Sequence, residues 1–164
     1  MHGAGRIHPL EPQLADLISS GPMVQSLPRA VEACVTNSIS AGASQIAVRI
    51  SPTSFGFSVE DDGRGIPANV LARLAEQQSA AARRGGSLAA LASTGFLTVT
   101  SKAASAFETF QVMLANGRAI SCGLAAQQRS TQGTVVYVND LFHSTPVRRK
   151  QMTPARYQTR KMCM

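Results

Sequence analysis

The sequence predicts an α+β fold, a two-layer arrangement in which a mixed, mostly antiparallel sheet carries helices on one face. The chain of 164 residues, 44% of them hydrophobic, is long enough for one globular domain with its own core. Helical patterns come first and strand-like runs dominate the second half. Strands and helices do not alternate throughout, as a parallel doubly wound sheet would require.

Two helices are expected near the N-terminus. Residues 11–19 have leucine and isoleucine at helical spacing, and residues 28–41 repeat the pattern. Pro28 suits the first turn of the second helix and Gly42 suits its end. The residues of this helix that are expected to be buried form one stripe: Val31, Cys34, Val35 and Ser38.

A hairpin and further strands follow. Residues 46–50 and 55–59 are strand-like runs joined by a Ser-Pro-Thr-Ser turn. An alanine-rich helix from about Ala68 to Arg83 and a short helix over residues 87–93 come next. Asn116-Gly117 is a strong signal for a tight turn between strands. The later strands are expected at residues 97–101, 107–114, 119–124 and 133–140.

The composition favours a soluble protein with reduced thiols. Sixteen Lys and Arg against nine Asp and Glu give a formal net charge of +7, which biases the chain toward polyanions such as nucleic acid or nucleotides. Three widely spaced cysteines, Cys34, Cys122 and Cys163, predict free thiols of an intracellular protein. We expect no metal site made of histidines, no signal peptide and no membrane span.

Four short patterns could carry chemistry, and each has an ordinary structural alternative. In DDGRGIP, residues 61–67, acidic side chains stand beside glycines that let backbone N–H groups face a ligand, although a plain tight turn has the same pattern. RRGG, residues 83–86, opens a helix whose free N–H groups favour a phosphate, or it is a simple loop. Thr134 on a late strand could hydrogen-bond a ligand, or the strand is an ordinary core strand. Asn37 on a helix could place its amide oxygen on a divalent cation, although most helical asparagines do not.

The fixed order of these four patterns resembles the Bergerat-type ATP-binding domain shared by gyrase, heat-shock chaperones, histidine kinases and MutL mismatch-repair proteins. Within this GHKL superfamily, DLFHSTPVRRK at residues 140–150 looks like a signature of the MutL family. NSISAGA at residues 37–43 and GGSLAALAS at residues 85–93 resemble two further MutL motifs. The resemblance runs from about Leu10 to about Met152 and is most similar to the MutL homologue three branch.

The resemblance implies a role for each matching residue. Asn37 would hold the magnesium ion that bridges the ATP phosphates. Asp61, helped by Thr134, would accept a hydrogen bond from the adenine amino group. Gly63 and Gly65 would let the backbone approach the nucleotide. The residues expected to face the phosphates are Arg84, Gly85, Ser87 and Leu88.

The same resemblance shows departures that affect hydrolysis. The family places its general-base glutamate four residues before the asparagine, and Ala33 occupies that position here. Glu32 is five residues before Asn37, about 140° away around a helix, so it should point away from the ligand. The segment between Asp61 and Gly85 is also shorter than in relatives and lacks their lid-like stretch. Because hydrolysis needs a positioned base and an excluded-water site, it should be weak or lost.

The resulting hypothesis is the ATP-binding part of a MutL homologue. Residues 1–150 would form the ATP-binding domain and residues 151–164 a basic tail, without the family's second and C-terminal domains. ATP and magnesium would drive dimerisation with another MutL homologue subunit and binding of DNA, in the nucleus. The expected DNA contacts are Arg148, Arg149 and Lys150. The alternatives are a scaffold module that ignores nucleotide, or an incomplete gene model of the same family.

Overall fold

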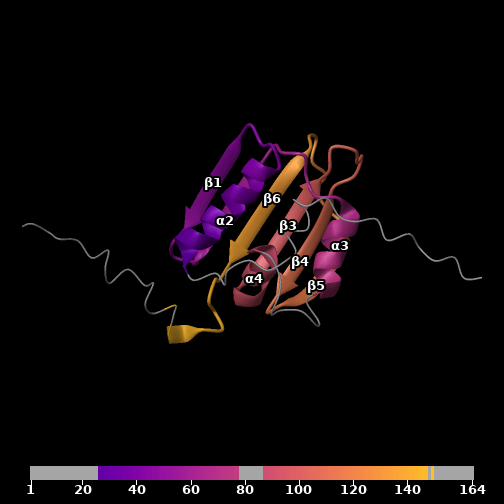
Figure 1. Ribbon diagram of the computed structural model, residues 1–164. Helices are drawn as coiled ribbons and strands as arrows, with labels where there is room; N and C mark the ends of the chain where they lie inside the picture. The colour runs from indigo at the N-terminus through magenta and orange to yellow at the C-terminus, as the bar shows by residue number, and fades with distance from the viewer. Residues whose placement is uncertain (1–25, 78–86, 148, 150–164) are drawn as a thin grey trace, which may run out of the picture.

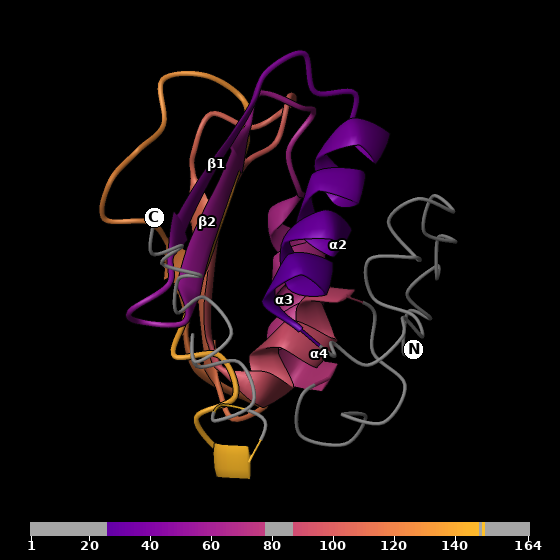
Figure 2. The same ribbon diagram turned by 90° about the vertical axis from the view of Figure 1, so that its left-hand side faces the viewer.

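The structure, a computed structural model, describes residues 26–77, 87–147 and 149. Its sheet has six strands in the order β1-β2-β6-β3-β4-β5. Among the described residues, helices α2, α3 and α4 pack on one face of the sheet and none of the three covers the other face (Figures 1 and 2). The expected helix at residues 11–19 and the expected tail at residues 151–164 lie outside the described residues.

Helix α2 (Leu27–Ser40) follows the expected boundaries to within one residue. Its N-cap is Ser26, whose side chain accepts a hydrogen bond from the backbone N–H of Arg29 at 3.4 Å. The chain leaves the helix through Gly42, at a φ of +73°. Of the expected buried stripe, Cys34 and Ser38 are buried, whereas Val31 and Val35 are only partly buried against the core. Ala30 is buried as well.

Strands β1 (Ile46–Ser51) and β2 (Gly56–Asp61) form the expected hairpin, with Val48 opposite Val59. Helix α3 (Ala68–Gln77) follows, and residues 78–83 of the helix expected there lie outside the described residues. Helix α4 (Ser87–Thr94) leads into β3 (Phe96–Lys102). The hairpin and the short helix are therefore confirmed.

The remaining strands are β4 (Phe110–Ala115), β5 (Arg118–Leu124) and β6 (Gly133–Asn139). Asn116 and Gly117 have φ angles of 51° and 70°, as the tight turn between β4 and β5 requires. All five pairings between neighbouring strands are antiparallel, which sharpens the expected mixed sheet to a fully antiparallel one. The α+β fold class is confirmed.

The expected start of the fourth strand, at Phe107, is wrong. The strand begins at Phe110, and the Phe107 side chain is 96% exposed. Thr109, fully buried, donates its backbone N–H to the Gln128 side chain at 2.7 Å, so this donor bonds the loop of residues 125–132 rather than a neighbouring strand. The apolar pattern could not reveal that a distant glutamine takes this hydrogen bond.

Strand order brings three distant parts of the chain together at one place. Although β6 comes last in the sequence, it lies in the middle of the sheet between β2 and β3. In this register Thr134 lies opposite Asp61 on one side and opposite Ser101 on the other. All three residues are on the face covered by α2 and are buried. The core continues from them through large apolar side chains: Phe57, Val59, Leu97, Val99, Val112, Leu114 and Val138.

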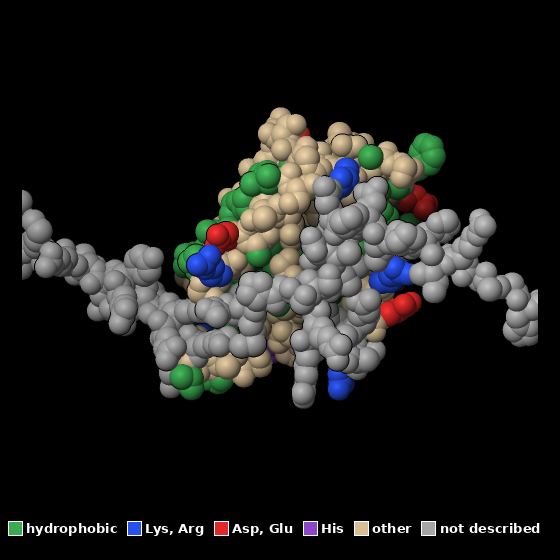
Figure 3. Space-filling view, viewed as in Figure 1, with side chains coloured by type: hydrophobic (Ala, Val, Ile, Leu, Met, Phe, Trp, Pro, Cys, Tyr) green, Lys and Arg blue, Asp and Glu red, His purple; other side chains and the backbone are tan. Residues whose placement is uncertain are grey.

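Charge is nearly balanced over the described residues. They contain eight Lys or Arg and seven Asp or Glu, whereas the whole chain has a net charge of +7. Where described residues are visible on the helix face, blue and red side chains stand in separate small groups (Figure 3). The basic excess therefore belongs mostly to residues outside the described ranges. None of the described helices is long and apolar enough to cross a membrane.

Candidate functional site

Asp61 is the centre of a buried hydrogen-bond cluster at the end of β2. Its side chain is 5% exposed. Carboxylate Oδ2 accepts a hydrogen bond from the Ser38 hydroxyl at 2.7 Å, and Oδ1 accepts from the backbone N–H groups of Gly63 at 3.0 Å and Thr134 at 3.2 Å. Helix α2, the glycine-rich loop and β6 each supply one donor. The carboxylate is thus fixed as an acceptor, with one lone pair on Oδ2 left for a donor from a ligand.

Only the first of the two adjacent aspartates enters this cluster. Asp62 points outward, and its carboxylate Oδ1 accepts from the backbone N–H groups of Ser44 at 2.7 Å and Gln45 at 2.9 Å. The hydrogen bond from Gln45 is the main cause that lowers the pKa of Asp62 below its ordinary value of 3.8. Asp62 therefore ties the loop after α2 to the end of β2, while Asp61 faces the interior.

The glycine-rich loop lies so close to its neighbours that a side chain at Gly63 or Gly65 would have too little room. Gly65 has a φ of +71°, and a Cβ atom there would lie 2.1 Å from the carbonyl oxygen of Lys102. A Cβ on Gly63 would lie 2.9 Å from Cβ of Ala41 and 3.1 Å from Oδ1 of Asp61. These two glycines bring the loop backbone against β3 and beside the Asp61 carboxylate.

Ser101 belongs to the same cluster and was not expected from the sequence. Its hydroxyl lies 2.8 Å from the Thr134 hydroxyl and accepts the backbone N–H of Ile66 at 2.8 Å. It also donates to the carbonyl oxygen of Gly133 at 3.1 Å. The available signal was a small polar residue at an inward position of β3, in the alternation Leu97, Val99, Ser101.

The part of helix α2 next to the Asp61 cluster carries Asn37 and the two positions considered for the general base, Ala33 and Glu32. Asn37 is partly buried, and its Nδ2 donates to the Ser87 hydroxyl at 2.9 Å. Ala33 lies one turn before Asn37 and brings no acid to this position. Glu32 points outward, 62% exposed, and pairs with Arg29 at 2.8 Å. Glu32 therefore points away from the pocket that Asn37 lines, as helical spacing predicted.

One small pocket lies between the Asp61 cluster and the part of helix α2 that carries Asn37. Its volume is about 30 Å³, close to the volume of one water molecule and far below the 300–1,000 Å³ of typical ligand sites. Cys34 lies in its wall, where burial raises the pKa of the thiol to about 12 and keeps it uncharged. Five of the residues expected to bind nucleotide line this pocket: Asn37, Asp61, Gly65, Leu88 and Thr134.

The other expected site residues lie as follows. Gly63 and Ser87 bond directly to pocket residues, Asp61 and Asn37. Arg84 and Gly85 lie outside the described residues, as do Arg148 and Lys150. Arg149 forms a close ion pair with Asp140, and its guanidinium lies 5.0 Å from the centre of the Phe55 ring. Within DLFHSTPVRRK, the buried Leu141 and Phe142 help build the core.

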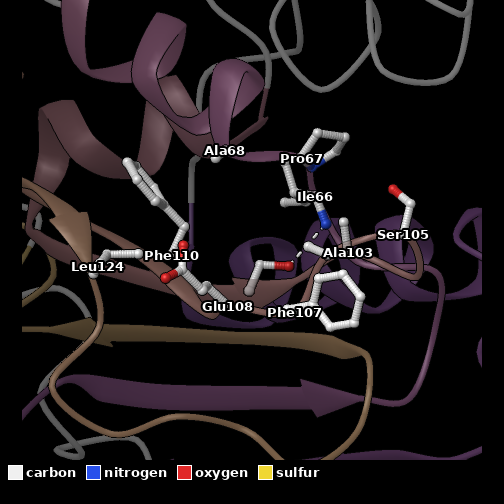
Figure 4. A pocket seen from close by; sticks show the side chains of 11 residues that line it. Ile66, Pro67, Ala68, Ala103, Ser105, Phe107, Glu108, Phe110 and Leu124 are labelled. Carbon is white, nitrogen blue, oxygen red and sulfur yellow. Dashed lines mark hydrogen bonds between the residues drawn. The ribbon is translucent and has the colours of Figure 1, made fainter.

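A larger cavity lies on the other side of Ile66. It has a volume of about 550 Å³, and Ile66 lines both it and the small pocket. Figure 4 shows Pro67, Ala103, Phe107 and Phe110 around it, with the hydrogen bond from Ile66 to Ser101 in its wall. Ile66 and the Ser101–Thr134 pair therefore form a thin partition between the two spaces.

One side chain of the pocket could contribute an oxygen ligand to a metal ion. The described residues contain no group of three or more His, Cys, Asp or Glu side chains placed to bind a metal. The amide oxygen of Asn37 is a hard oxygen donor at the pocket. Magnesium is commonly bound through one or two protein oxygens plus substrate phosphates, so this donor fits a magnesium–nucleotide complex.

Comparison with known proteins identifies the fold and the family. Residues 25–132 match the family described as histidine kinase-, DNA gyrase B- and HSP90-like ATPases. The DNA mismatch repair protein MutL of Pseudomonas paraeruginosa is 36% identical over 165 residues, which cover 92% of this chain and 26% of that protein. The DNA mismatch repair protein MLH3 of Arabidopsis thaliana is 29% identical over 161 residues, covering 89% of this chain and 14% of that protein.

Solved structures agree with the sequence relatives. The N-terminal domain of a DNA repair protein superposes with a TM-score of 0.69 at 27% identity, covering 82% of this chain and 41% of that one. The ATPase domain of MutL from Aquifex aeolicus, complexed with ADP, gives a TM-score of 0.64 at 24% identity, covering 77% and 47%. The chain spans about a quarter of the length of the MutL relatives it matches. The resemblance to one particular branch stays a prediction.

Proposed function

The chain belongs to the histidine kinase-, DNA gyrase B- and HSP90-like ATPase family as a MutL-type domain, and from this premise we propose that it binds ATP with magnesium. The observation that carries the proposal is the buried Asp61 carboxylate, held by three donors and facing the pocket that Thr134 and Asn37 also line. A fixed, buried acceptor selects a ligand that carries a hydrogen-bond donor, such as the amino group of adenine.

Different residues would bind different parts of the nucleotide. Asp61 and Thr134 would bind the base, Gly63 and Gly65 would bring the backbone close to the nucleoside, and Asn37 would contribute an oxygen to magnesium. Ser87 and Leu88, in the first turn of α4, would face the phosphates together with Arg84 and Gly85. Magnesium, when bound, neutralises charge on the phosphates.

The small volume of the pocket sets a condition on binding. At about 30 Å³ the space between the described walls is smaller than an adenine ring, so we expect the nucleotide to bind a conformation in which these walls lie further apart. Opening costs free energy, so only a fraction of the molecules is open at any time. The apparent affinity equals the affinity of the open form multiplied by that fraction. Binding should therefore be weaker than the well-ordered acceptor alone would suggest.

Hydrolysis by this chain is proposed to be weak or absent. Ala33 cannot remove a proton from water, and the acid nearest to it in sequence, Glu32, is exposed and paired with Arg29. Without an acid at position 33, the general-base catalysis expected from that position, normally worth about 10²–10⁴-fold, is lost. The domain would then respond to ATP by binding it rather than by consuming it.

Dimerisation, DNA binding and location in the nucleus complete the proposal. We expect ATP to promote association with another MutL homologue subunit, and DNA to bind weakly through phosphate contacts without sequence preference. Because the described residues are nearly neutral, the DNA contacts should come mainly from other basic residues, including Arg148 and Lys150. Raising the salt concentration should abolish this binding, and binding that persists at high salt would contradict it.

The direct experiment is titration of the purified chain with a non-hydrolysable ATP analogue, with magnesium and with chelator. The proposal predicts saturable binding that is tighter with magnesium. Absence of binding at millimolar analogue would refute a working nucleotide pocket.

A scaffold module that does not need nucleotide is the second candidate. The small volume of the pocket and the missing acid at Ala33 favour it. A ligand that binds only the folded state raises the melting temperature, so magnesium-ATP should stabilise the chain under the first proposal and leave it unchanged under the second.

A further inference from the structure

Asn37 and Ser87 make a side-chain contact between two helices of the pocket. They are 50 residues apart in the sequence, one on α2 and the other at the first position of α4. Nδ2 of Asn37 donates to the Ser87 hydroxyl oxygen at 2.9 Å, and the contact is partly buried. The side chain of Asn37 is therefore held by a partner on another helix.

The direction of this hydrogen bond decides what Asn37 can bind. The amide group has a donating nitrogen and an accepting oxygen, which point in different directions in one plane. When Nδ2 of Asn37 donates to the Ser87 hydroxyl, Oδ1 of Asn37 stays available at the pocket that Asn37 lines. A divalent cation of the magnesium type binds oxygen and not an amide nitrogen. The opposite orientation, with Ser87 donating to Oδ1, would use the very atom that a cation needs.

We infer that Ser87 is a positioning residue for magnesium-ATP, because it holds the Asn37 amide with Oδ1 turned toward the cation. The inference rests on the proposed function, since it concerns how the same pocket binds its metal. Ser87 itself need not touch the metal. Its hydroxyl disfavours one of the two amide orientations. The Asn37 side chain therefore loses less conformational freedom when magnesium-ATP binds.

The chain offers a matched set of serine variants on α4. Ser87→Ala removes the hydroxyl, and Ser87→Thr keeps one at the same position. Ser93→Ala is the control, since the Ser93 hydroxyl bonds the Ala90 carbonyl oxygen of its own helix at 2.7 Å. Each variant is titrated with a non-hydrolysable ATP analogue, once with magnesium and once with chelator.

Loss of one such hydrogen bond changes a binding constant by about three- to tenfold. Ser87→Ala should therefore weaken binding by about three- to tenfold with magnesium and by less than about twofold with chelator. Ser87→Thr should restore the magnesium effect, and Ser93→Ala should match the wild type. In nucleotide-free protein, the side-chain amide NMR signals of Asn37 should shift in Ser87→Ala and stay in place in Ser93→Ala.

Two results separate this inference from the proposed function. If the wild type binds the analogue in a magnesium-dependent way and Ser87→Ala binds equally well or more tightly, the positioning role is overturned and the nucleotide pocket stands. Unchanged Asn37 amide signals in Ser87→Ala would overturn it as well. If the wild type binds in neither buffer, the proposed function fails and the inference fails with it.

Discussion

The two ends of the pocket share helix α2 and are built in different ways. At the end proposed to bind the adenine base, called the base end below, Asp61 is buried and bonded to Ser38, to the glycine-rich loop and to β6. At the proposed phosphate end, Asn37 bonds Ser87 and Ala33 stands where the family's acid would be. The base end is part of the core, so changes there should cost stability. At the phosphate end, the Asn37–Ser87 contact is only partly buried, so changes to these two side chains should cost less stability.

Gly65→Ala should have the largest effect and should fall on stability. The new Cβ would lie 2.1 Å from the Lys102 carbonyl oxygen at a backbone φ of +71°. Strained backbone and overpacking together should lower the free energy of unfolding by about 3 kcal/mol or more. Urea denaturation measures this. Gly123→Ala is the control, because a Cβ there meets no atom within 4 Å, and an equal loss in both variants would contradict the account.

Ala33→Glu should have the next largest effect, and it should fall on turnover. Restoring an acid one helical turn before Asn37 should raise the rate of phosphate release by about 10²-fold. The free energy of unfolding should stay within about 0.5 kcal/mol, as for most substitutions without a buried partner. Glu32→Ala is the control, and it should leave turnover unchanged because Glu32 pairs outward with Arg29. No gain from Ala33→Glu would place the defect elsewhere, for example in the shortened segment before Gly85.

Ser38→Ala should have an intermediate effect on stability. It removes the donor that lies 2.7 Å from Oδ2 of the buried Asp61 carboxylate. Leaving a buried charged group short of one hydrogen bond should cost about 1–3 kcal/mol of unfolding free energy. Ser40→Ala, two residues along at an exposed position, should cost less than about 0.5 kcal/mol. Equal stability of the two variants would mean that the base end is not part of the core.

The smallest effect concerns Asp62 and acid. Its pKa in the folded chain is lowered below 3.8 by backbone hydrogen bonds, chiefly from Gln45. A lowered pKa stabilises the fold above the unfolded value, and this contribution is lost as the pH falls through the folded value. Between about pH 5 and pH 2 the melting temperature of Asp62→Asn should therefore fall slightly less than that of the wild type. A steeper fall in the variant would contradict this assignment.

The sequence predicted the helix of the site well because local signals mark both of its ends. Pro28 and Gly42 delimit α2 to within one residue, and helical spacing correctly places Glu32 outside. Ser101 was missed because its importance depends on strand order, which puts β3 beside a strand that comes 32 residues later. The Asn37–Ser87 contact joins residues 50 apart, so only the packing of α2 against α4 reveals it.

The error at β4 also comes from a contact between residues far apart in the chain. Apolar residues at Phe107 and Phe110 suggested a continuous strand, yet Thr109 is held by Gln128 and Arg129 from a distant loop. A hydrogen bond from a side chain outside the strand cannot be read from local alternation. Motif patterns therefore located the site, while the partners that hold its residues in place came from tertiary structure.

The most direct test of the account compares the two adjacent aspartates in one titration. Asp61→Asn changes a buried acceptor at the pocket, whereas Asp62→Asn changes an exposed one that bonds the loop at Ser44 and Gln45. With magnesium and a non-hydrolysable ATP analogue, Asp61→Asn should lose at least about tenfold in affinity and Asp62→Asn less than about twofold. Equal affinity of the two variants, with the wild type binding normally, would show that Asp61 does not recognise the base.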